Sequence, residues 1–118
     1  MALVAAGLNV EKNALAAAAT HIALHSADPG ATGANQTSAG RVAAGWPASA
    51  NGLIVVAGKN FTGGAGNGPV THVGLWGGAT GGTFYGSFPI PTGNGSTNDV
   101  QFNAAGEYTL TSFALQGA

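Results

Sequence analysis

The sequence has no cysteine and very little charge. Without cysteine, the chain can form no disulfide, no thiolate metal site and no cysteine nucleophile. Three basic and four acidic residues give a formal net charge of −1. No nucleic-acid partner is therefore expected, because proteins hold phosphate backbones with clusters of basic side chains. The charged residues are Glu11, Lys12, Asp28, Arg41, Lys59, Asp99 and Glu107.

A long hydrophobic run is also missing. Residues 1–8 are apolar but carry no basic leader, and Glu11 and Lys12 follow shortly after them. This run is too short for a membrane span, which needs about 20 apolar residues, or for a signal-peptide core with its flanks. We expect neither a membrane segment nor a targeting segment.

Glycine, by contrast, is abundant. The chain of 118 residues has the length of a single domain, 1–118, and 21 of its residues are glycine. This approaches the composition of disordered chains, but disorder usually also needs a high net charge. We therefore expect a folded, turn-rich domain. Because only 6% of the residues are charged, the surface loses few solvated groups when another copy covers it, and we predict a homotrimer or another closed homo-oligomer.

A helix is predicted over residues 9–19. Asn9 suits the N-cap, because its side chain can accept a hydrogen bond from a free backbone amide, and the alanines that follow have high helix propensity. The preceding segment, 1–8, has two interpretations. It is either an arm whose Leu3, Val4 and Leu8 cover another surface, or an extension of the helix that packs on the chain's own core.

Short strands are predicted in the first half of residues 20–118. Alternation over 20–25 indicates a half-buried strand, which the turn Ala27–Gly30 ends. Alternation also predicts a strand over 41–46. Residues 53–59 are apolar on both parities, which predicts a central strand covered on both faces.

Two strand pairs are predicted in the second half. Residues 70–76 and 83–90 are joined by a glycine-rich loop, and residues 100–102 and 107–115 form a last hairpin. The predicted fold class is therefore mainly β: an antiparallel β-sandwich of short strands, residues 20–118, with one N-terminal α-helix.

The sequence offers little for catalysis or for metal binding. His21 and His25 share a face of the predicted strand, but Ile22 stands where a zinc protease carries glutamate, and Asp28 is the only further ligand nearby. His72 has only remote carboxylates, and no G-x-S-x-G elbow is present. The glycine-rich stretches lack the spacing of phosphate-binding loops. We expect no enzymatic activity, no metal and no cofactor.

Two tryptophans end predicted strands. Trp46 precedes Pro47 and Trp76 precedes Gly77. At such positions an aromatic side chain either closes the core or anchors an interface. Both interpretations stay open for each tryptophan.

Three stretches of the sequence resemble short virion proteins of tailed bacteriophages, especially of phages that infect actinobacteria. They are 23–35 (ALHSADPGATGAN), 71–86 (THVGLWGGATGGTFYG) and 106–115 (GEYTLTSFAL). Proteins of this kind are described as tail-fibre-like or as head decoration (minor capsid) proteins. The resemblance implies a small β-rich subunit, trimeric, on the capsid or the tail of a virion, and it implies no catalytic residue.

Two functions are consistent with this resemblance. The main expectation is a capsid decoration (cement) protein that binds the major capsid protein, where many copies multiply a weak contact. The alternative is a tail-fibre or tail-tip component that contacts tail proteins or a host surface glycan through exposed Trp or Tyr. Length favours the first, because a fibre usually needs a stalk. The candidate interface residues are Leu3, Val4, Leu8, Asp28, Pro29, Gly30, Trp46 and Trp76.

Overall fold

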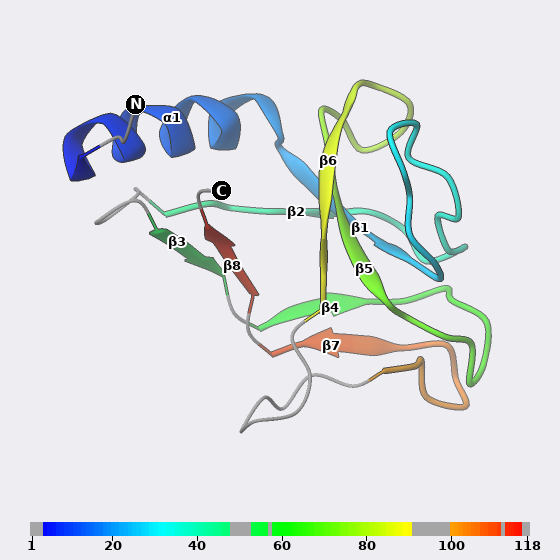
Figure 1. Cartoon of the computed structure of the whole chain (residues 1–118). Helices are drawn as coiled ribbons and strands as arrows, with labels where there is room; N and C mark the ends of the chain where they lie inside the picture. The colour runs from blue at the N-terminus through cyan, green and yellow to red at the C-terminus, as the bar shows by residue number, and fades with distance from the viewer. Residues whose placement is uncertain (1–3, 48–52, 57, 91–99, 112, 117–118) are drawn as a thin grey trace.

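One helix and eight short strands form the part of the chain that the structure describes. The structure is a computed structural model and describes residues 4–47, 53–56, 58–90, 100–111 and 113–116. Every strand pair is antiparallel, so the predicted class, mainly β with one N-terminal helix, is confirmed (Figure 1). The elements are α1 (Ala5–Ala18), β1 (His21–His25), β2 (Val42–Ala43), β3 (Leu53–Val56), β4 (Lys59–Phe61), β5 (His72–Trp76), β6 (Phe84–Pro89), β7 (Tyr108–Leu110) and β8 (Phe113–Gln116).

The helix begins earlier than the sequence predicted. Val4 occupies the N-cap of α1 without a side-chain cap bond, and Asn9, the expected cap, lies inside the helix. The alanines before Asn9 have enough helix propensity to carry the helix upstream, and Leu8 N donates to Val4 O at 3.0 Å. Residues 5–8 of the predicted arm therefore form the first turn of α1, whereas 1–3 lie outside the described residues.

The inner face of α1 covers β3, and Figure 1 shows the helix lying above β3 and β8. Leu15 and Ala16 pack against the hydrophobic core. Lys12 lies on this inner side with only 4% of its surface exposed, and its Nζ is 2.9 Å from Glu11 Oε1. On the outer side Val10 is 70% exposed, so α1 turns an apolar side chain toward solvent.

The main sheet has the strand order β2-β1-β5-β6. β5 and β6 form the predicted hairpin, with an irregularity in register between Leu75 and Trp76. β2 is limited to Val42–Ala43 and is shorter than the strand predicted over 41–46. Because β2 ends at Ala43, the chain after it leaves the main sheet and runs beneath α1, where Trp46 lies.

β1 is buried on both faces, not on one as its alternation predicted. Ala23 and His25, expected on the solvent side, have no exposed surface. The segment 26–41 folds back over that side, and His25 Nδ1 lies 2.8 Å from the carbonyl oxygen of Ala34. The cover comes from a loop of small and polar residues, which a periodic apolar pattern does not reveal.

Arg41 fastens this covering loop to the loop between β5 and β6. Its Nη1 donates to the carbonyl oxygens of Gly78 at 3.0 Å and Gly81 at 2.6 Å, and its Nη2 donates to Gln36 Oε1 at 3.1 Å. The guanidinium carbon lies 3.9 Å from the centre of the Trp76 ring. The planar guanidinium thus holds two loops and covers an aromatic face at the same time.

We predict that Arg41→Lys lowers the free energy of unfolding by about 1–2 kcal/mol, because lysine keeps the charge but cannot reach several acceptors with one planar group. Urea unfolding followed by circular dichroism measures the loss. Amide hydrogen exchange in the loop 77–82 should accelerate in the same variant. Unchanged stability and unchanged exchange in Arg41→Lys would contradict the role given to this side chain.

β3 and β4 pair with β8 and β7 in two separate two-stranded sheets. β3 pairs with β8 and β4 with β7, and the two pairs share a single register. The single strand predicted over 53–59 is wrong, because the chain divides at Gly58 into β3 and β4, and each half has one described partner strand. The predicted cover on both faces of residues 53–57 lies outside the described side chains. Gly58 has a φ of 68°, a left-handed conformation that glycine adopts without strain.

The pairing of β4 with β7 continues beyond the ends of these two strands. Gly64 N donates to Gly106 O at 3.0 Å, and Pro69 forms an antiparallel bridge with Gln101. The hairpin predicted within 100–115 is also wrong, since its two arms pair with residues near 69 and with β4. We call the described residues of 53–70 and 100–116 the ribbon. In Figure 1 its strands β4 and β7 lie beneath the main sheet, and β3 and β8 lie beneath α1.

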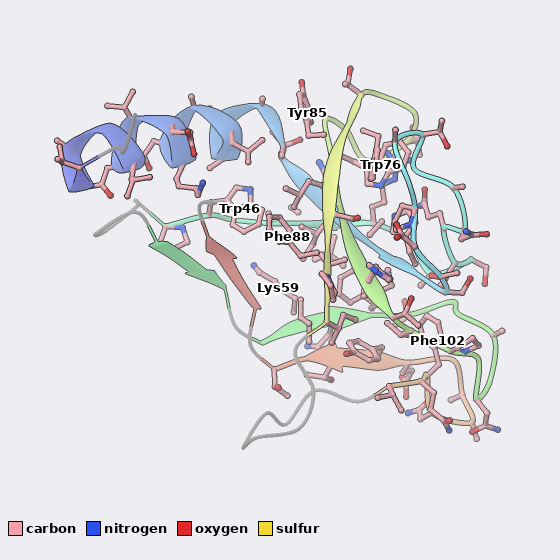
Figure 2. The ribbon with its side chains drawn as sticks, viewed as in Figure 1. Trp46, Lys59, Trp76, Tyr85, Phe88 and Phe102 are labelled. Carbon is pink, nitrogen blue, oxygen red and sulfur yellow. The ribbon has the colours of Figure 1, made fainter. Side chains whose placement is uncertain are left out.

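One hydrophobic core lies between the main sheet and the ribbon. The rings of Phe61 and Phe102 both meet Tyr108 edge to face, with ring centres 6.5 and 6.2 Å apart. Phe88 of β6 packs against this core, and Figure 2 shows it in the interior. The main sheet contributes Ile22, Leu24, Val73 and Leu75, and the ribbon contributes Phe61, Val70, Phe102, Tyr108 and Leu110.

Candidate functional site

Three of the candidate interface residues belong to the N-terminal end of the chain. Leu3 lies outside the described residues. Val4 is 74% exposed at the start of α1, and Leu8 is partly buried within the helix. The structure therefore presents Val4, with Val10 on the same helix, as apolar surface available to a partner.

Three further candidates form the turn Asp28–Gly30. Asp28 Oδ1 accepts a hydrogen bond from Gly30 N at 2.9 Å, and Asn35 Nδ2 donates to the Asp28 carbonyl at 3.1 Å. Pro29 is fully buried beneath the turn, whereas Asp28 and Gly30 are exposed. Hydrogen bonds from within the same loop hold the turn, and it exposes only small residues, Asp28 and Gly30.

Trp76 lies in a buried cluster on the second face of the main sheet. It is 9% exposed, and its ring is parallel to the His25 ring at a centroid distance of 6.3 Å. Its Nε1 donates to His25 Nε2 at 3.4 Å. Phe84 packs 5.0 Å from it, between ring centres, and Arg41 covers its face. In this chain Trp76 holds the covering loop to the sheet.

Trp46 occupies a different environment, beneath α1 (Figure 2). Its Nε1 donates to the carbonyl oxygen of Ala19 at 2.7 Å, which fixes the indole against the end of the helix. The side chain is partly buried and packs against the core. Trp46 therefore both closes the core and keeps part of its ring accessible.

The accessible part of Trp46 lines a groove of about 450 Å³. On one side are Asn13, Ala16, Ala17 and Thr20, from α1 and the residue that follows its end; on the other are Gly45, Trp46 and Pro47. We call this hollow the Trp46 groove. None of its lining residues carries a charge.

The helix side of the groove was not predicted from the sequence, although a signal exists. Asn13, Ala16, Ala17 and Thr20 recur at the spacing of one helix face. On that face the small side chains of Ala16 and Ala17 leave a hollow, and Asn13 and Thr20 place polar groups at its two ends. These four residues form a groove only because Trp46 lies opposite them, and the sequence does not predict that position.

A second, smaller hollow of about 250 Å³ is lined by residues of the ribbon. Its polar side chains already bond to each other: Thr109 Oγ1 donates to Asn60 Oδ1 at 2.9 Å, and Asn103 Nδ2 donates to Glu107 Oε1 at 3.2 Å. Phe61 and Tyr108, its aromatic lining, are almost completely buried. It offers a ligand less accessible aromatic surface than the Trp46 groove does.

The described histidines do not form a metal site with other ligand side chains. Among the described residues, no three His, Cys, Asp or Glu side chains gather as ligands. The two ring nitrogens of His25 contact Ala34 and Trp76, and His21 Nδ1 lies 2.9 Å from Thr20 Oγ1. In the same part of the chain, no helix is long and apolar enough to cross a membrane.

Comparison with known proteins finds a family match over most of the chain. The family is described as podophage GP4 fiber I protein gp80, and its profile matches residues 5–113. The match begins at the first residue of α1 and reaches β8, so it includes the main sheet and the Trp46 groove. No curated protein matches the chain, and no solved structure does.

Proposed function

The chain belongs to the podophage GP4 fiber I protein gp80 family, and from this membership we propose that it is a non-enzymatic structural subunit of a phage tail fibre. The family consists of phage structural proteins, in agreement with the virion assignment that the sequence resemblance gave. Its name supports the fibre function, which was the alternative expectation, over capsid decoration, which was the main one. Nothing in the match refers to a head protein or to an actinobacterial host.

The described fold is consistent with a subunit that needs partners to become a fibre. The resolved elements form two packed layers and no extended stalk (Figure 1). We propose that the copies associate as a homotrimer through the outer side of α1. Val4 and Val10, at 74% and 70% exposure, would bury apolar surface there. The neighbouring exposed charge, Glu11, already lies 2.9 Å from Lys12 Nζ.

Virion labelling tests the fibre function. Gold-conjugated antibodies against the chain should mark the tail of intact virions from the phage that encodes it, with few copies per particle. Labelling of the head surface at hundreds of copies per particle would instead support capsid decoration and overturn the proposal. Antibodies against the major capsid protein give the matched head-labelling control.

Light scattering tests the proposed trimer. At micromolar concentration the purified chain should have three times its monomer mass of 11.4 kDa. Val10→Asp should shift the chain toward monomer, because a carboxylate would be buried at the interface without a counter-charge. Asn60→Asp, at an exposed position of β4 and not on α1, is the control and should leave the mass unchanged. A monomer mass for the unmodified chain would overturn the trimer.

A further inference from the structure

We infer that the Trp46 groove binds a neutral saccharide, such as a hexose unit of a host surface glycan. The inference rests on the proposed fibre function for its biological setting, but the groove itself carries the chemical argument. Four features of the groove point to this ligand: a fixed indole, neutral polar groups at the rim, a floor of small residues, and the absence of charge from the lining.

The fixed indole supplies the apolar contact. Trp46 Nε1 is already bonded to Ala19 O at 2.7 Å, so the ring is held in place and its hydrogen-bond donor is occupied. What it presents to the groove is therefore aromatic carbon surface. A pyranose has one face of C–H groups that packs on such a surface, and a preformed ring loses little conformational entropy when it binds.

The polar groups fit hydroxyls rather than ions. Asn13 brings an amide and Thr20 a hydroxyl to the two ends of the helix side. Thr20 Oγ1 already lies 2.9 Å from His21 Nδ1, but a hydroxyl has more than one hydrogen-bonding site, and an amide can both donate and accept.

Ala16 and Ala17 lie in the last turn of α1, where backbone carbonyls point toward the C-terminal end and carry partial negative charge. Hydroxyl donors suit such an end, whereas phosphate or carboxylate would meet repulsion from it. The lining itself has no basic side chain, and the ammonium of Lys59, which lies beside Gly45, is the cation next to it.

The size of the groove also fits. Its volume of about 450 Å³ falls in the range of about 300–1,000 Å³ that small-ligand sites occupy. Asn13, Ala17, Thr20, Gly45 and Pro47 are exposed, so the groove is open to solvent along one side. A sugar at the end or in the middle of a longer glycan can therefore enter without a change of fold.

The test is a titration of the isotopically labelled chain with glucose, N-acetylglucosamine and rhamnose, read from the two indole N–H signals in NMR spectra. At least one sugar should shift the Trp46 signal saturably at millimolar concentration and leave the Trp76 signal, buried under Arg41, unchanged. The absence of a saturable Trp46 shift with all three sugars overturns the inference.

Two alanine variants on one helix provide the control. Ala17 and Ala14 are both exposed on α1, but only Ala17 lines the groove. Ala17→Leu fills the groove and should weaken the binding at least tenfold, whereas Ala14→Leu should bind like the unmodified chain. Equal binding by Ala17→Leu would place the sugar elsewhere and overturn the inference. A lower oligomer mass in Ala17→Leu, without sugar binding by the unmodified chain, would show that the groove holds a second copy.

The outcomes of this test are separable from those of virion labelling. Tail labelling without sugar binding would leave the fibre function in place and remove the saccharide site. Head labelling with a saturable Trp46 shift would remove the fibre function and keep the site. Thr20→Val gives a finer measurement, because it retains the shape and removes one hydroxyl, and it should reduce the affinity. It also removes the contact of Thr20 Oγ1 with His21 Nδ1, so the circular dichroism spectrum of the variant should be compared with that of the unmodified chain.

Discussion

Gly74→Ala is expected to lower the free energy of unfolding by about 2–4 kcal/mol, which combines overpacking of a filled site with the loss of a buried hydrogen bond. Gly74 lies in the middle of β5, opposite Ala23. A Cβ at this position would lie 2.8 Å from His25 Cδ2 and 3.0 Å from Trp76 Nε1, and would be closer still to His25 Nε2. The methyl group would therefore enter the space where the two rings bond to each other.

Neither ring can move away easily. His25 has no exposed surface and is tied to Ala34 O, and Trp76 is held between Phe84 and Arg41. Relief must come from displacement of the covering loop 26–41, so the variant should also expose this loop to proteases. Chemical denaturation and limited proteolysis measure the two effects.

Gly40→Ala is the matched control for this prediction. It lies in the covering loop, its φ is not positive, and a Cβ there would meet nothing within 4 Å. Its free energy of unfolding should stay within about 0.5 kcal/mol of that of the unmodified chain. If Gly74→Ala proved as stable as Gly40→Ala, the close packing of His25 on β5 would be refuted.

The hairpin of β5 and β6 could be predicted because its signals are local. Alternating side chains flank a loop of glycines, and Pro89 marks the end of the second strand. Such signals depend on neighbours in the sequence. The same reasoning failed for the ribbon, because the turn-like residues 103–106 suggested a hairpin, whereas the strands on either side pair with segments far away in the chain.

The burial of His25 shows a second limit of sequence reasoning. Alternation placed His25 on a solvent face, since the pattern considers only side-chain polarity along one strand. In the structure its two ring nitrogens meet Ala34 O, nine residues away, and Trp76 Nε1, 51 residues away. Satisfied in this way, an imidazole is buried at little cost. No local pattern contains these partners.

The candidate site was predicted in part. The position of Trp46 at the end of a strand, before Pro47, left two interpretations open, core or interface, and in the structure Trp46 packs on the core and lines a groove. Trp76 received the same interpretation but is buried in this chain. The difference arises from Arg41 and the covering loop, which reach Trp76 and not Trp46.

The surroundings of His25 also make the stability of the fold depend on pH. Burial lowers the pKa of His25 below its ordinary value of 6.5, and the nearby His72 and Arg41 lower it further; the hydrogen bond to Ala34 opposes them in part. With Nδ1 donating to Ala34 O, Nε2 must be unprotonated to accept from Trp76 Nε1. If Nε2 of His25 were protonated, its N–H would face the N–H of Trp76 Nε1, and neither could accept a hydrogen bond from the other.

We therefore predict that the free energy of unfolding falls as the pH is lowered below about 6.5. Above this pH, His25 is neutral in both the folded and the unfolded chain and contributes no slope. Below it, the unfolded chain binds a proton that the folded chain binds only at a lower pH, so protons favour unfolding. For this single group the slope is at most about 1.4 kcal/mol per pH unit, and it vanishes below the pKa of the folded state. Urea unfolding at a series of pH values measures it.

His25→Asn separates this effect from the titration of other groups, because an asparagine amide can still donate to Ala34 O but does not titrate. The variant should be less stable at neutral pH and should lose the additional slope between pH 6.5 and the lower pKa of the folded chain. His21→Asn, on the same strand but partly exposed, should keep that slope. A slope that persists in His25→Asn and disappears in His21→Asn would assign the pH dependence to His21 and contradict the neutral, doubly bonded His25.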